Sequence, residues 1–149
     1  MPTIPEIDKN ILTFCDRAAV PFARFALFII YFWFGLLKVV GESPASPLVK
    51  DLLARTLPFI SPELFVILFG VFEMLIGLLF IVPGLERVAI PVLFFHMFLT
   101  AGPLVLLPQE TWSSFLAPTL EGQYIIKNLA LIGCAIGIVA KMEPIKRWF

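Results

Sequence analysis

The chain has 149 residues, of which 60% are hydrophobic, and its mean hydropathy is +0.97. Soluble domains contain about 45–50% apolar residues, so the composition excludes a soluble globular domain and predicts an integral membrane protein in contact with lipid. Eleven basic residues balance eleven acidic ones, so bulk charge predicts no nucleic-acid partner.

The first twenty residues are predicted to form a cytoplasmic lead-in. They carry charged residues such as Glu6, Lys9 and Arg17 and lack the apolar core and cleavage site of a signal peptide. Around residues 11–19 the pattern predicts a short amphipathic helix that lies at the membrane interface.

Four long apolar runs follow, each bounded by proline, glycine or charge. Each can cross about 30 Å of hydrocarbon at a rise of about 1.5 Å per residue. We therefore predict a single membrane domain over 1–149, an all-α antiparallel bundle of four transmembrane helices. The spans are expected at about 21–40, 63–82, 88–107 and 123–140.

The connections between these runs differ in length. Residues 41–62 contain four prolines and predict an ordered loop with a short interfacial helix over 48–57. Residues 83–87 are long enough only for a tight turn. Residues 108–122 include Trp112 and Phe115, whose rings favour the headgroup level. Two ordered outer loops, packed against each other, are the expected result.

Orientation is predicted from the distribution of basic residues. Seven Lys and Arg residues fall on the side that holds both termini and the tight turn, whereas four fall on the opposite side. The positive-inside rule then predicts a multi-pass protein of the inner (plasma) membrane with both termini in the cytoplasm.

Several titratable residues lie inside the predicted spans, where a charge costs at least about 2.5–3.5 kcal/mol. Glu73 and His96 fall near mid-bilayer and could meet, and Lys127 or His96 is the expected partner of Glu73. Lys38 lies near the end of the first span, and Asn128 is expected to hydrogen-bond a neighbouring helix. A ligand-binding or proton-handling site and a purely structural polar cluster remain alternative interpretations.

Small residues predict two helix contacts. Gly70 and Gly77 share a helical face with Glu73, and Gly133 and Gly137 have the GxxxG spacing that favours a homo-oligomer or another membrane-protein partner. The two cysteines are isolated, so neither a disulfide nor a metal site is predicted.

Specific segments resemble the DoxX-like superfamily of small four-helix membrane proteins, and in particular its YkgB-like branch. The resemblance spans about residues 24–140 and depends on an ordered set of motifs: Phe34-Gly35-Leu36-Leu37-Lys38, Ser43-Pro44-Ala45-Ser46-Pro47, Gly70-Val71-Phe72-Glu73, His96-Met97 and Glu121-Gly122-Gln123-Tyr124-Ile125-Ile126-Lys127-Asn128. By matching position, it implies a candidate site made of Lys38, Glu73, His96 and Lys127, without a catalytic assignment.

What the resemblance implies about activity is diverse: thiosulfate:quinone oxidoreduction, methylamine dehydrogenase maturation, oxidant resistance and membrane-protein assembly. One hypothesis is therefore a redox- or stress-associated subunit that binds a quinone or another small ligand between its helices. The alternative is a non-catalytic accessory or assembly subunit of a larger membrane complex. Whether the chain is an enzyme stays open.

Overall fold

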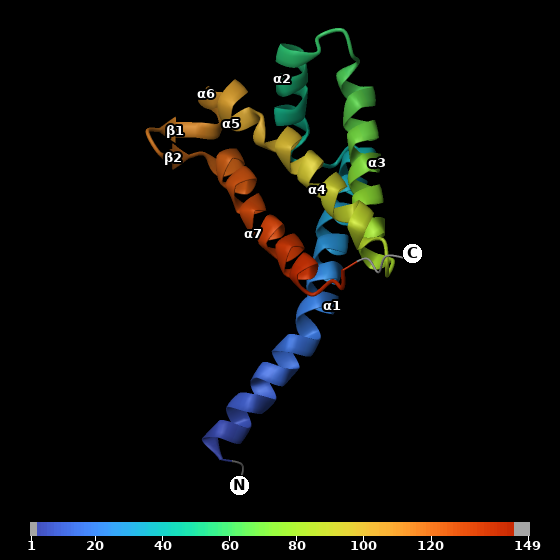
Figure 1. Cartoon of the computed structure of the whole chain (residues 1–149). Helices are drawn as coiled ribbons and strands as arrows, with labels where there is room; N and C mark the ends of the chain where they lie inside the picture. Colours follow the sequence, from blue (N-terminus) through green and yellow to red (C-terminus); the bar gives the residue numbers. More distant parts are fainter. Residues whose placement is uncertain (1–2, 145–149) are drawn as a thin grey trace.

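The computed structural model describes residues 3–144 and is mostly helical (Figure 1). Four of its helical segments are long and apolar enough to cross a membrane. In length and composition they match the predicted all-α multi-pass membrane protein. They are Ile4–Val39, Pro62–Ile81, Glu86–Leu106 and Leu120–Ala140. Lys146 and Arg147, two of the basic residues counted for the orientation, lie outside the described residues.

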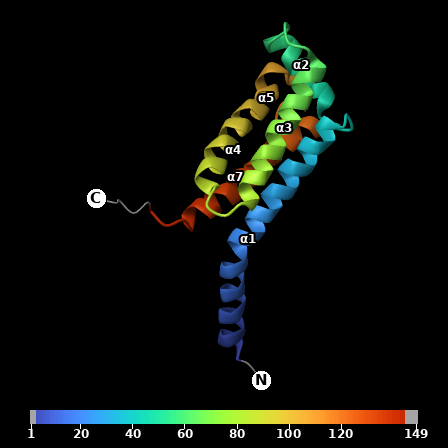
Figure 2. The ribbon, with the colours of Figure 1, turned by 90° about the vertical axis from the view of Figure 1, so that its right-hand side faces the viewer.

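Helix α1 (Ile4–Val39) combines the predicted lead-in and the first span. The carboxylate of Glu6 accepts a hydrogen bond of 2.8 Å from the backbone N–H of Thr3, which caps the amino-terminal turn. The predicted helix around residues 11–19 is present as part of this longer helix, which continues through Pro21. The amino-terminal half of α1 projects away from the other helices in both views (Figures 1 and 2).

The first long connection contains α2 (Ser46–Thr56), close to the predicted short helix. Leu53 of α2 is buried, and α2 packs against α3 (Pro62–Ile81) and α5 (Pro103–Leu106). The tight turn after α3 is confirmed, and Gly84 in it has a φ of +89°, a conformation that favours glycine.

The third membrane-crossing segment consists of two consecutive helices. Helix α4 (Glu86–Ala101) is capped by Gly102, and Pro103, which has no N–H, begins α5. The following connection contains α6 (Pro108–Thr111) and a short antiparallel hairpin of β1 (Trp112–Ser114) and β2 (Ala117–Pro118), which the sequence pattern did not reveal.

Helix α7 (Leu120–Ala140) begins three residues before the predicted span because the Thr119 hydroxyl caps it, accepting from the N–H of Gly122 at 3.2 Å. Gly122 is buried against the carbonyl of Thr111, where a side chain would not fit. The connection between α5 and α7 thus packs on α7, and the connection that contains α2 contacts α5.

The most extensive helix contact joins α1 and α3. A Cβ added to Gly70 would lie 2.6 Å from the Gly35 carbonyl oxygen, and one added to Gly77 would lie 2.9 Å from the Phe32 nitrogen. Later residues of α3 therefore meet earlier residues of α1, so these two helices are antiparallel. The helix contact predicted for Gly70 and Gly77 is confirmed.

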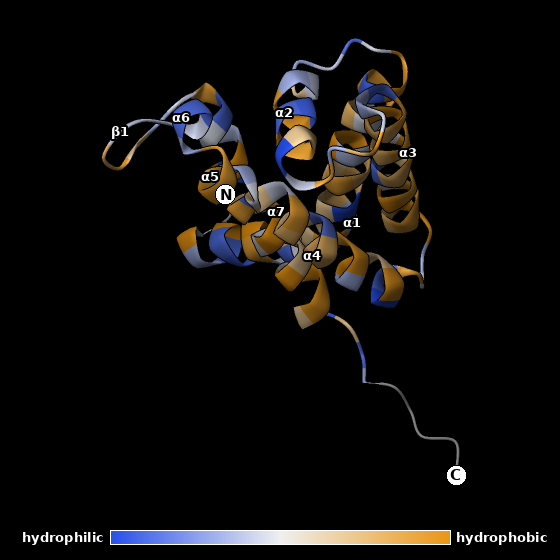
Figure 3. Ribbon diagram, turned by 90° about the horizontal axis from the view of Figure 1, so that it is seen from above, coloured by the Kyte–Doolittle hydropathy of each residue, from blue (hydrophilic) through white to orange (hydrophobic). Residues whose placement is uncertain are grey.

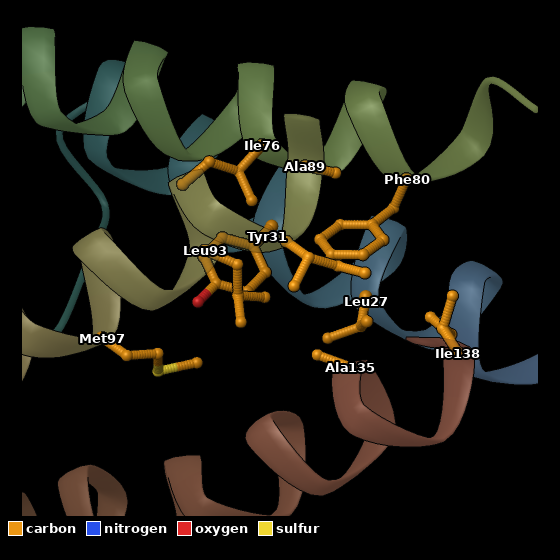
Figure 4. Packing of buried hydrophobic residues seen from close by; sticks show 10 residues of the cluster. Leu27, Tyr31, Ile76, Phe80, Ala89, Leu93, Met97, Ala135 and Ile138 are labelled. Atoms are coloured by element: carbon orange, nitrogen blue, oxygen red, sulfur yellow. The ribbon is translucent and has the colours of Figure 1, made fainter. Parts of the chain in front are cut away.

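A buried apolar cluster joins α1, α3, α4 and α7 (Figure 4). Its fully buried members include Leu27, Ile76, Phe80 and Leu93. Large hydrophobic side chains are also exposed along the outside of the helices, whereas α2 and α6 carry more hydrophilic residues (Figure 3). An apolar exterior of this kind is what lipid-facing helices require.

Candidate buried polar site

Three helices bring four polar side chains together inside the apolar interior. Tyr31 and Lys38 come from α1, Glu73 from α3 and His96 from α4. All four are at least nine-tenths buried, with relative exposures of 4–6%. Polar groups buried this deeply in a membrane protein need partners, and here they are each other's partners.

Glu73 is the centre of this set. One of its oxygens, Oε2, accepts a hydrogen bond from Lys38 Nζ at 2.6 Å, and the other, Oε1, lies 3.1 Å from His96 Nε2. The predicted meeting of Glu73 and His96 is confirmed. The pairing of Glu73 with a lysine is also present, but the lysine is Lys38 of α1.

The fourth member is Tyr31, whose hydroxyl lies 3.2 Å from His96 Nδ1. With Glu73 ionised and His96 neutral, Nε2 carries the proton toward Glu73, because a carboxylate can only accept hydrogen bonds. Nδ1 is then the acceptor for the Tyr31 O–H. The hydrogen bonds consequently form one continuous chain, Tyr31–His96–Glu73–Lys38, which we call the polar chain.

Aromatic rings enclose the His96 end of the polar chain. Phe69 stacks on His96 with ring centres 5.1 Å apart and an interplanar angle of 18°, and Phe72 lies 6.0 Å away. Lys38 Nζ is 5.8 Å from the centre of the Phe69 ring, within the range of a cation–π contact. These rings hold the imidazole plane and exclude water from one side of the polar chain.

The polar chain has no net charge when Lys38 is protonated, Glu73 is ionised and His96 and Tyr31 are neutral. Mutual neutralisation explains how four titratable groups can be buried together. The Glu73 carboxylate still has lone pairs that accept no hydrogen bond, and Nδ1 of His96 becomes free when the Tyr31 O–H turns away, so the set can take up one proton by rearranging its hydrogen bonds.

Two predicted site residues lie elsewhere. Lys127 is exposed on α7, with its Nζ 5.3 Å from the centre of the Tyr124 ring, so the expected pairing of Lys127 with Glu73 is wrong. Asn128 is half-buried, and within residues 3–144 its side chain makes no hydrogen bond to a neighbouring helix. Both lie near the start of α7, a helix that does not contribute to the polar chain.

A second charged pair lies near the opposite end of the bundle. Arg24 of α1 forms an ion pair with Glu86 of α4. Its Nε also donates a hydrogen bond of 2.9 Å to the carbonyl of Phe80, close to the end of α3. The pair joins α1 to the turn between α3 and α4.

The GxxxG face of α7 has no neighbour in the described chain. A Cβ added to Gly133 or Gly137 would meet nothing within 4 Å.

A hollow of about 490 Å³ lies beside the α3–α4 turn, between Glu86, Arg87 and Lys141. The four residues of the polar chain do not line it.

Tyr31 is the site residue that sequence reasoning missed. A signal was present, because Tyr31, Gly35 and Lys38 are spaced four and three residues apart and so share one helical face. This spacing mirrors that of Gly70, Glu73 and Gly77 on α3, against which it packs.

Comparison of the chain with protein-family models, with curated proteins and with solved structures finds no match.

Proposed function

We propose that this protein is a redox- or stress-associated membrane subunit in which the polar chain handles protons for a small ligand, such as a quinone, bound between the helices. The observation that carries the proposal is the continuous hydrogen-bond chain from Tyr31 to Lys38. Its inclusion of an imidazole and a carboxylate, groups that exchange protons readily, supports it. The DoxX-like resemblance agrees with this class of function.

The proposed setting is an antiparallel four-helix bundle in the inner membrane with both termini in the cytoplasm, supported by the basic-residue distribution. Cys15 is exposed on the amino-terminal half of α1 and reports this orientation. A membrane-impermeant thiol reagent should leave Cys15 unlabelled in intact cells and label it after the inner face is opened. A Cys134→Ala background removes the second thiol. Labelling in intact cells would reverse the orientation.

The test of function is Glu73→Gln. The amide still hydrogen-bonds Lys38 and His96, which keeps the variant inserted although Lys38 loses its counter-charge, but it cannot take up a proton, so the cellular phenotype should be lost. Extraction in mild detergent followed by mass spectrometry should find a bound quinone or similar ligand in the wild type. A fully active Glu73→Gln protein at normal abundance, with no small molecule bound to the wild type, rejects the proposal.

The second candidate is a non-catalytic accessory or assembly subunit. It is favoured by the small face of α7, where Gly133 and Gly137 leave room for a close helix neighbour. Co-purification with a stable partner that Gly133→Leu abolishes, together with an active Glu73→Gln protein, would select this function over the first.

A further inference from the structure

The two ends of the polar chain lie at different depths in the bundle. Lys38 is one residue from the end of α1, at the end of the bundle that carries α2, which we call the α2 end. Tyr31 lies seven residues earlier, or about 10 Å deeper at a rise of about 1.5 Å per residue. The Lys38 side of the polar chain is therefore the side nearer to an end of the bundle.

An apolar layer separates Tyr31 from the opposite end. Leu27, Phe80 and Ala89 are completely buried, and Ile138 is 1% exposed. Figure 4 shows the Tyr31 hydroxyl directed away from Leu27, Phe80 and Ile138. The next charged groups in that direction, Arg24 and Glu86, form an ion pair, while Nη2 of Arg24 has no hydrogen-bond partner among the described residues.

We propose that the polar chain exchanges protons with the water at the α2 end and is sealed from the water at the α3–α4 turn. This inference rests on the proposed function, in which the polar chain handles protons, and it adds the side from which they come. A proton taken up binds a lone pair of the Glu73 carboxylate, or binds Nδ1 of His96 after the Tyr31 O–H has turned away from it. The surplus positive charge is the same in either case, and no covalent bond other than the new O–H or N–H forms.

The groups that surround His96 support a single route. The imidazole of His96 contacts Tyr31 of α1 and Glu73 of α3 directly, and it is linked to Lys38 through Glu73. On α7, Cys134 is the titratable side chain that packs against the adjoining core. No described titratable residue bridges the apolar layer between Tyr31 and Arg24.

The experiment uses His96 as a reporter, because it is the only histidine in the chain. The full-length protein is labelled with ¹⁵N-histidine and sealed in lipid vesicles. Vesicles with Cys15 outside are captured on a thiol resin, in a Cys134→Ala background, to give one orientation. The pH is then varied from about 5 to 9 on one side while the other side is buffered, and the imidazole nitrogen signals are recorded.

The expected result is a change in the His96 signals only when the pH at the α2 end changes. Lys38→Met should abolish that response, whereas Lys127→Met, which removes an exposed lysine outside the polar chain, should keep it. A response from the α3–α4 side, or from both sides, overturns the sealed direction and leaves proton handling intact. No response from either side overturns both this inference and proton handling, even if Lys38→Met cannot be produced.

Discussion

Helices α1 and α7 carry similar residues and put them to different uses. Each has a tyrosine followed by a lysine on the same face and small residues at helical spacing. In α1 this face lies against α3, and Tyr31, Gly35 and Lys38 are all buried. In α7 Tyr124 and Lys127 are exposed, and so is Gly133, which lies on another face of the helix. A residue pattern alone therefore does not identify a buried site, because the contacting helix decides whether the polar groups are desolvated.

The comparison is sharpest for the two lysines. Replacing Lys38 with Met leaves the Glu73 charge buried with only His96 beside it, and breaking a buried ion pair costs about 3–5 kcal/mol. Lys127→Met should cost at most about 1 kcal/mol, since it removes one exposed cation–π contact. Thermal unfolding of both variants in the same mild detergent measures the difference. Equal losses of stability would mean that Lys38 is not the essential counter-charge of Glu73.

The glycines provide a second matched pair. In Gly70→Ala the new methyl group would collide with the Gly35 carbonyl oxygen, which belongs to the backbone and cannot rotate away. Overpacking of this kind costs about 1–3 kcal/mol. Gly133→Ala meets open space and should raise the free energy of unfolding by up to about 1 kcal/mol through helix propensity. Destabilisation of the purified monomer by Gly133→Ala would contradict the open face of α7.

Much of this fold could be predicted from the sequence. Hydrophobic runs predicted four membrane-crossing helices, and the glycine spacing around Glu73 predicted a close helix contact. The pairing of Glu73 with His96 was predictable because their depths in adjacent spans match.

The choice between Lys38 and Lys127 could not be made from depth. Both lie at comparable distances from the α2 end, and only the rotation of each helix about its axis shows which one faces Glu73. The β1–β2 hairpin is likewise hidden, because its tip residue Leu116 adopts a φ of 59°, which its side chain does not favour.

The smallest expected difference in stability is between variants of the two tyrosines of the chain, Tyr31→Phe and Tyr124→Phe. Tyr31→Phe retains the ring that packs in the core and removes the hydroxyl 3.2 Å from His96, leaving Nδ1 without its donor. Hydrogen bonds between transmembrane helices contribute about 0.6 kcal/mol on average and at most about 1.7 kcal/mol, so the expected loss falls in that range. Tyr124→Phe should change the stability little, because this side chain is 62% exposed. The ¹⁵N spectrum of His96 gives the more direct measurement, since loss of the donor should shift Nδ1 in Tyr31→Phe and leave it unchanged in Tyr124→Phe. An unchanged Nδ1 signal in Tyr31→Phe would remove Tyr31 from the polar chain and end the chain at His96.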